Sequence, residues 1–276
     1  MQSAIWSNYG YRVERALFSR DTQRYPFHPA AAYVPNVADL VDDPLAEYLE
    51  RMRQEGIDRA VLVHPEPYGD DQRLLLDCLA REPQRLRGVC HFFPKDPESP
   101  RKLAETVRRE SRIVAVRLHA HRGKEHYLDS FADAGVRAIW RAAAELGLIV
   151  ELHIGPSYAA QAAAAIAAFP SVPVLIDHMA EPQFGTAVEY AEALDLARFD
   201  NVWMKLSGFS HISNDAPLHL DVGPFVRRVA AAFGADRLCW GGGTPAIIDA
   251  HLGHFSADER AQVKGGNLAR LLGFDR

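Results

Sequence analysis

Short apolar runs rich in β-branched residues alternate along the chain with longer segments in which apolar side chains recur at helical spacing. The runs predict strands over residues 59–65, 86–93, 113–120, 148–154, 172–178, 201–208 and 237–242. The segments between them predict helices over residues 45–55, 71–82, 100–111, 132–146, 158–169, 187–198, 222–233 and 257–272. Because the strands are almost continuously apolar, we expect a parallel sheet covered by helices.

The number of strands favours a closed architecture. With an eighth strand predicted over residues 15–19, the pattern fits a (β/α)8 TIM barrel, a fold of about 250 residues, as one domain spanning residues 1–276. A doubly wound open sheet usually carries a glycine-rich turn after its first strand, and none follows Leu17 or Val63. The proline-rich and aromatic segment 20–43 is predicted to be an ordered lid loop.

Ionisable side chains gather near the carboxyl ends of the predicted strands. They are His64, Arg117, His119, Glu151, His153, His178 and Lys205. Strand alternation puts Arg117 on the same face as His119, and it puts His178 on the opposite face from Asp177. Active sites of barrels lie at these strand ends, and isolated buried charges are costly. A single shared polar pocket is therefore predicted.

Composition narrows the class of partner. The chain has 276 residues and a net charge of −5, without a basic face, so no nucleic-acid partner is expected. No apolar run approaches the ~20 residues of a membrane helix, so no membrane partner is expected either. Cys78, Cys90 and Cys239 are scattered, which favours reduced thiols and a cytoplasmic location. A homo-oligomer is compatible with the sequence.

Segments 56–79, 83–89, 169–182, 201–210, 233–245 and 265–274 resemble, in order, the amidohydrolase-2 family of the amidohydrolase superfamily. The resemblance covers the chain from about Arg20 onward. It implies a TIM barrel related to 2-pyrone-4,6-dicarboxylate lactonase and the sugar lactonases. It also implies a small carboxylated, lactone or ester substrate.

Two family motifs are degenerate. The resemblance implies an Asp-x-His-x-His run after the first strand, and alignment places Arg12, Glu14 and Ala16 at these positions. It also implies Trp-Gly-Ser-Asp-x-Pro near the end of the barrel, where the aspartate position is Gly243 and the preceding Trp240 is retained. We therefore expect a divergent active site that lacks the usual acid and most metal ligands.

The remaining polar residues predict metal-independent chemistry without a cofactor, as the resemblance to the lactonase also implies. His178 and His153 are suited to general acid and base roles, Arg117 to clamping a carboxylate, and Lys205 to polarising a carbonyl. Substrate contacts are predicted for His64, His119, Tyr25, Phe27 and Trp240, with a place in the core as the alternative for Trp240. A relocated zinc site would use His119, His121, His153 and His178.

Three functions follow from these residues. The first is a hydrolase of lactones or small esters, as the overall resemblance implies. The second is a lyase, isomerase or cyclase that uses the basic side chains without a hydrolytic acid. The third is a binding protein without catalysis, because Gly243 has no side chain to activate water.

Overall fold

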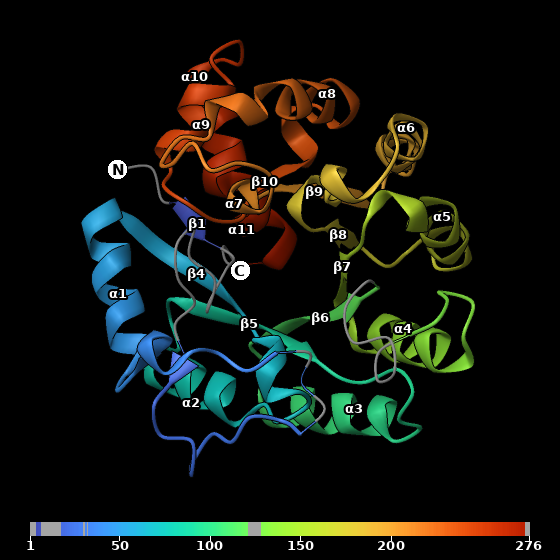
Figure 1. Ribbon diagram of the computed structural model, residues 1–276. Helices are drawn as coiled ribbons and strands as arrows, with labels where there is room; N and C mark the ends of the chain where they lie inside the picture. The colour runs from blue at the N-terminus through green and yellow to red at the C-terminus, as the bar shows by residue number, and fades with distance from the viewer. Residues whose placement is uncertain (1–3, 7–17, 30, 32, 121–127, 274–276) are drawn as a thin grey trace.

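Eight parallel strands form one curled sheet with helices around its outside, as the computed structural model shows for residues 4–6, 18–29, 31, 33–120 and 128–273 (Figure 1). In sheet order the strands are β1 (Ala4–Trp6), β4 (Ile57–Val63), β5 (Leu86–His91), β6 (Ile113–His119), β7 (Ile149–His153), β8 (Val174–Ile176), β9 (Val202–Leu206) and β10 (Leu238–Trp240). Together with the comparisons below, this arrangement confirms the predicted (β/α)8 barrel.

Helices follow the strands in the predicted order. They are α1 (Pro44–Glu55), α2 (Arg73–Arg81), α3 (Ser99–Arg109), α4 (Ala134–Leu146), α5 (Ala159–Ala168), α6 (Ala187–Asp195), α7 (Phe209–Ile212), α8 (Gly223–Phe233), α9 (Ala246–His251), α10 (Ala257–Ala261) and α11 (Asn267–Leu272). Local signals set their ends. Asp43 caps α1 by accepting a hydrogen bond from the Ala46 amide, and Gly56 ends the helix in the left-handed conformation.

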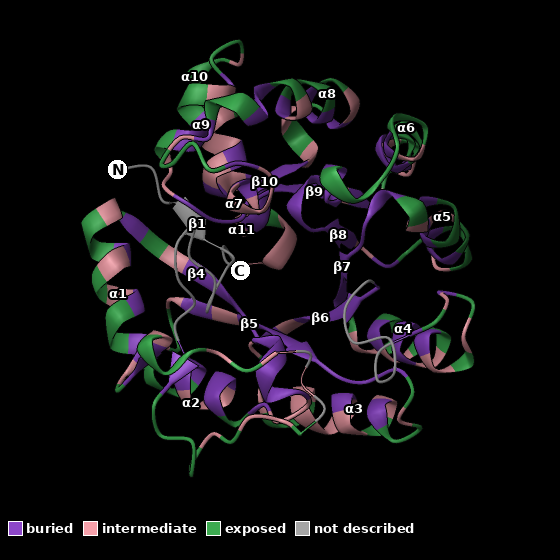
Figure 2. Ribbon diagram, in the orientation of Figure 1, coloured by how far each residue is buried: buried purple, intermediate pink, exposed green. Residues whose placement is uncertain are grey.

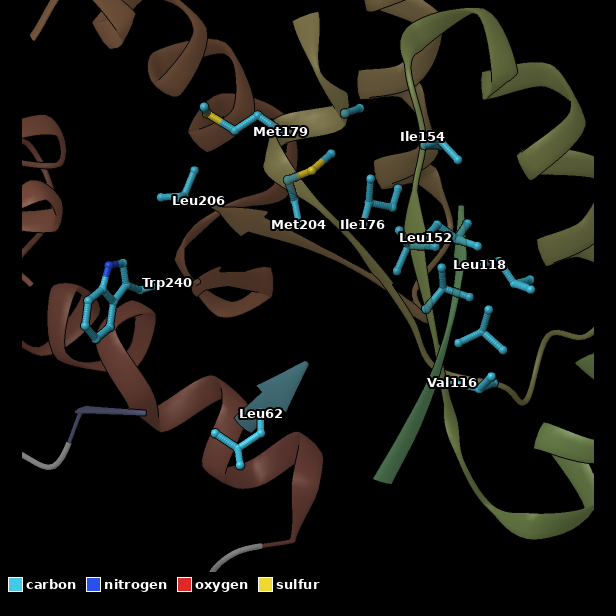
Figure 3. Close-up of a cluster of buried hydrophobic side chains, with 14 of the residues drawn as sticks. Leu62, Val116, Leu118, Leu152, Ile154, Ile176, Met179, Met204, Leu206 and Trp240 are labelled. Atoms are coloured by element: carbon cyan, nitrogen blue, oxygen red, sulfur yellow. The ribbon is translucent and has the colours of Figure 1, made fainter. Parts of the chain in front are cut away.

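The strands separate two apolar layers by simple alternation. Leu62, Leu118 and Leu152 belong to the main core (Figure 3). The strands are mostly buried, and exposed residues lie on the outer helices and loops (Figure 2). Val61, Val63, Val89, Ala115, Ile149, Leu175 and Cys239 form a second cluster, against which Leu268 of α11 packs. On four of these strands the next residue on the same face is polar: His91, Arg117, Glu151 and Asp177 follow two positions after Val89, Ala115, Ile149 and Leu175. The barrel interior therefore changes from apolar to charged towards the carboxyl ends of these strands. The candidate site therefore lies at the carboxyl ends of the strands, where the charged side chains begin.

The predicted first strand is wrong. Residues 4–6 pair with β4 in the barrel, and of the predicted strand 15–19 the structure describes Phe18 and Ser19. Phe18 and Ser19 form β2, which pairs with β3 (Leu40–Val41) in a separate two-stranded sheet. The reason is that an apolar run specifies strand propensity but not its partner, and a three-residue barrel strand leaves almost no periodic signal.

The helix predicted over residues 257–272 is also interrupted. The chain forms α10, then a π-helix over Gln262–Gly266, then α11. The wider turn contacts both β1 and β10, the first and last strands of the sheet. Asn267 donates to the carbonyl oxygens of Ala235 and Leu238 at 2.7 Å each, which ties this helix to β10.

The segment 20–43 lies against the loops that follow β4 and β5. The His28 amide donates to the Pro67 carbonyl at 2.7 Å, and the His28 ring lies 5.0 Å from the Phe93 ring. Phe27 packs 5.2 Å from Tyr68, measured between ring centroids. The lid role of this segment stays a prediction. Among the described residues, none of the helices has the length and hydropathy needed to span a bilayer.

Candidate active site

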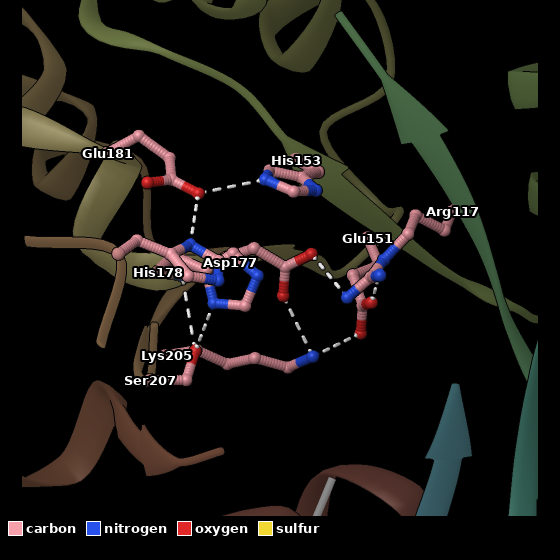
Figure 4. Close-up of polar contacts among 9 residues, drawn as sticks. Arg117, Glu151, His153, Asp177, His178, Glu181, Lys205 and Ser207 are labelled. Carbon is pink, nitrogen blue, oxygen red and sulfur yellow. Dashed lines mark hydrogen bonds and ion pairs between the residues drawn. The ribbon is translucent and has the colours of Figure 1, made fainter. Parts of the chain in front are cut away.

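Four charged side chains form a buried network across the barrel interior (Figure 4). The Arg117 guanidinium lies 2.5 Å from Glu151 Oε1 and 2.7 Å from Asp177 Oδ2. The Lys205 ammonium lies 2.6 Å from Glu151 Oε2 and 2.8 Å from Asp177 Oδ1. Each cation therefore contacts both acids, and no side chain of the four is more than 3% exposed. We call this set the charge network.

The charge network alters the acids in opposite directions. Burial raises the pKa of Asp177 to about 6, because desolvation and the charge of Glu151 together outweigh the two cations. Burial also opposes ionisation of Glu151, but Arg117 and Lys205 outweigh it and hold its pKa below the ordinary value. Because two cations face two acids, Arg117 and Lys205 form their ion pairs within the charge network. Their predicted substrate roles stay predictions.

A row of histidines lies beside the charge network. Ring centroids are 5.5 Å apart between His91 and His119, 4.8 Å between His119 and His153, 4.7 Å between His153 and His178, and 4.8 Å between His178 and His211. We call these five residues the histidine arc. His119 and His153 are aligned neighbours at the ends of β6 and β7, so register alone brings their rings together. His91 and His211 were not predicted, although His91 closes an apolar strand just as His64 does.

The chain reverses direction after β8 through an unusual turn. His178, Met179, Ala180 and Glu181 all have positive φ, between 49° and 59°. Left-handed backbone costs a non-glycine residue about 1–2 kcal/mol, so the surrounding packing must offset this strain. All four side chains are buried. Strain of this kind is concentrated at functional sites, which makes the turn a marker of the site.

The structure corrects the predicted orientation of Asp177. The prediction put Asp177 on the face opposite His178, but Asp177 has extended backbone two residues after Leu175 of the second cluster, and its side chain lies in the charge network. The strand ends at Ile176, and the turn then carries the His178 ring back over the strand ends. There the Nδ1 atom of His178 lies 2.8 Å from Ser207 Oγ, which also accepts from the His178 amide at 3.3 Å.

Glycine at position 208 makes room for this ring. Gly208 has φ +65°, and a Cβ built there would lie 2.7 Å from Cβ and Cγ of His178. Real side chains do not approach so closely, so a larger residue would displace the histidine. Ser207 and Gly208 together therefore set the position of His178.

Glu181 at the end of the turn joins two members of the histidine arc. Its Oε1 atom lies 2.9 Å from His153 Nε2 and 2.9 Å from His211 Nδ1, and its Oε2 atom accepts from the side-chain Nε2 of Gln183 at 2.5 Å. The side chain is fully buried. Sequence reasoning missed Glu181 because it lies beyond the strand, where alternation makes no prediction.

His64 and His91 share one backbone acceptor. His64 Nε2 lies 3.0 Å and His91 Nδ1 lies 3.1 Å from the Gly69 carbonyl oxygen. A carbonyl only accepts, so each ring donates through that nitrogen. Burial lowers the pKa of His64 to about 4 and that of His91 to about 3. Both rings are therefore neutral at neutral pH.

Comparison with known proteins identifies the lineage. A family model described as Amidohydrolase matches residues 16–274. The chain belongs to this amidohydrolase family. It is 30% identical over 260 residues to a 4-sulfomuconolactone hydrolase of Hydrogenophaga intermedia, covering 91% of this chain and 77% of that protein. It is 27% identical over 245 residues to an L-fucono-1,5-lactonase of Burkholderia ambifaria, covering 82% and 83%.

Solved structures agree on the amidohydrolase fold. A probable 2-pyrone-4,6-dicarboxylic acid hydrolase of Acinetobacter baumannii superposes with a TM-score of 0.76 at 22% identity, covering 99% of this chain and 100% of that one. A 5-carboxyvanillate decarboxylase of Sphingomonas paucimobilis superposes with a TM-score of 0.66 at 15% identity, covering 99% of each chain. These comparisons confirm the expected family and the expected kind of enzyme, a hydrolase-like amidohydrolase. A lyase remains the open alternative.

Other side chains of this amidohydrolase that were predicted to contact the substrate lie in different parts of the fold. The Tyr25 hydroxyl donates to Asp77 Oδ2 at 2.6 Å, which anchors the segment 20–43 to α2. Trp240 is fully buried in the main core, with its indole N–H donating to the Gly242 carbonyl at 2.7 Å. Gly243 has φ 76°, a conformation that favours glycine. His121, Arg12, Glu14 and Ala16 lie outside the described residues.

A metal ion would find one suitable group among the described residues of this amidohydrolase. One ligand atom each from His153, His178 and Glu181 lie within 4.8 Å of one another. Two imidazoles and a carboxylate are a donor set that zinc accepts. His153 Nε2 and Glu181 Oε1 form a hydrogen bond in this structure. The group thus fits either a metal ion or a hydrogen-bonded acid–base pair.

Proposed function

We propose that the protein hydrolyses a small lactone by metal-independent acid–base catalysis. The observation that carries this proposal is the close pair formed by His153 and His178, with ring centroids 4.7 Å apart and planes at 80°. Each ring has its own polar partner, Glu181 for His153 and Ser207 for His178. The lactone hydrolases among the relatives support the substrate class.

In the proposed reaction, His178 takes a proton from water as the oxygen adds to the lactone carbonyl carbon. The resulting intermediate loses its ring oxygen when the acyl–oxygen bond breaks. That oxygen takes a proton from protonated His153, whose positive charge the Glu181 carboxylate stabilises. The product is an open hydroxy acid, and the two histidines have exchanged protonation states.

The test is a lactone panel assayed by proton release after dialysis against a chelator. The panel contains 4-sulfomuconolactone, a 2-pyrone dicarboxylate and a neutral sugar 1,5-lactone. We expect the wild-type protein to turn over at least one of them, His178→Asn to lose about 10²–10⁴-fold in kcat, and metal content to stay below stoichiometric. Turnover that disappears with a removed metal would overturn the metal-independent mechanism. No turnover of any lactone would overturn the function and favour the lyase or binding alternatives.

A further inference from the structure

We infer that His28 is a positioning residue that acts, through Gly69, on two buried histidines. These are His64, which follows β4, and His91, which ends β5. His28 belongs to the segment 20–43, which is distant from both histidines in the sequence. The consequence for catalysis rests on the proposed function, whereas the consequence for the two rings does not.

The carbonyl oxygen of Gly69 is the contact that the two histidines share. His64 donates to it through Nε2 at 3.0 Å, and His91 donates to it through Nδ1 at 3.1 Å. Because one oxygen accepts from both rings, a displacement of Gly69 changes both hydrogen bonds together. Both rings are buried, so exchange of their N–H protons with water requires the structure to open locally.

The ring of His28 lies against the side of Gly69 on which a side chain would project. Gly69 has φ +60°, and a Cβ built on it would lie 2.6 Å from Cγ and 2.7 Å from Cβ of His28. Real side chains do not approach so closely, so the ring of His28 occupies the space beside Gly69. The ring therefore blocks movement of the glycine in that direction.

Other contacts hold His28 in this place. Its backbone amide donates to the Pro67 carbonyl at 2.7 Å, and its ring centroid lies 5.0 Å from that of Phe93. Three residues earlier in the chain, the Tyr25 hydroxyl donates to Asp77 Oδ2 at 2.6 Å. This part of the segment is therefore fastened to α2 and to the loops after β4 and β5, and it supports Gly69 from a fixed position.

His91 connects Gly69 to the histidine arc. Its ring centroid lies 5.5 Å from that of His119, which lies 4.8 Å from that of His153, the proposed general acid. A shift of Gly69 therefore reaches the proposed acid through two ring contacts. Since a misplacement of about 1 Å at a reacting group can cost about 10²-fold in rate, a small shift is enough to lower kcat.

The experiment measures hydrogen exchange of the two ring N–H protons by ¹⁵N-edited NMR on the full chain. In the wild-type protein at neutral pH, we expect slow exchange of Nε2–H in His64 and of Nδ1–H in His91. His28→Ala removes the ring and should speed the exchange of both protons about tenfold relative to the backbone amides of β4. His28→Phe keeps a ring beside Gly69 and should restore slow exchange. The exposed control His254→Ala should leave both exchange rates unchanged.

Kinetics supply the second readout. On a lactone that the wild-type protein hydrolyses, kcat should fall about tenfold in His28→Ala and recover in His28→Phe, with equal amounts of folded protein by circular dichroism. Unchanged exchange or unchanged kcat in His28→Ala, or equally fast exchange in His28→Phe, would overturn the inference even though lactones are hydrolysed. Faster exchange in His28→Ala that His28→Phe restores, without turnover of any lactone, would support the inference and overturn the proposed function.

Discussion

The charge network makes a quantitative prediction about stability. Lys205→Met removes one of the two cations, so Glu151 and Asp177 must share Arg117 and the network acquires a net charge of −1. Breaking a buried ion pair by removing one partner costs about 3–5 kcal/mol. At about 2.1 cal/mol/K per residue, the entropy of unfolding for 276 residues is about 0.6 kcal/mol/K, so Tm should fall by about 5–9 °C.

Calorimetry at pH 7.5 measures this change against Lys95→Met. Lys95 pairs with Asp129 at 3.0 Å on the surface, where an ion pair is worth about 0–1 kcal/mol, so Tm of that control should fall by less than 2 °C. The defect of Lys205→Met should shrink as pH falls from 7.5 towards about 6, because burial already raises the pKa of Asp177, the loss of Lys205 raises it further, and protonation removes the excess charge. Two variants with the same Tm at pH 7.5 would show that the network is not electrostatically coupled.

Two further predictions concern the histidines. Gly208→Ala should lower kcat by about 10²-fold, because the added Cβ displaces His178. The control Gly147→Ala has a similar φ of +68° but open space around the Cβ, so it should lower stability and leave kcat unchanged. Equal activities of the two variants would refute this reasoning. Because the pKa values of His64 and His91 are lowered to about 4 and 3, the unfolded chain binds more protons than the folded one below about pH 6.5, and stability falls with pH. Between pH 7 and 5, the free energy of unfolding of the double variant His64→Gln with His91→Asn should fall less than that of the wild-type protein, by up to about 2 kcal/mol per histidine in urea titrations. A pH dependence equal to that of the wild-type protein would contradict the assigned burial.

Much of the fold could be predicted because most barrel strands carry long apolar runs. Seven of the eight strands were recognised in this way, and the family comparison confirms the barrel. The first strand could not be recognised, since Ala4–Trp6 is too short for a periodic pattern and Phe18–Ser19 lies nearby with equal propensity. Pairing depends on contacts distant in sequence, and local propensity does not encode them.

The site was predictable only as far as strand alternation reaches. Arg117 and Lys205 lie inside their strands, and the structure places both in the barrel interior. His178 and Glu181 follow the end of β8, where four left-handed residues replace the alternation. No residue type in that stretch demands positive φ, so the turn is imposed by packing and could not be read from composition.

The two histidines of the proposed acid–base pair have different electrostatic surroundings. His178 lies against the Ser207 hydroxyl, whereas His153 faces the Glu181 carboxylate. A hydrolase needs one group that accepts a proton from water and another that protonates the leaving oxygen, and unequal surroundings keep these roles apart. The proposed reaction takes the carboxylate that creates this separation from the turn after β8, and so it needs no acid on the loop after β10.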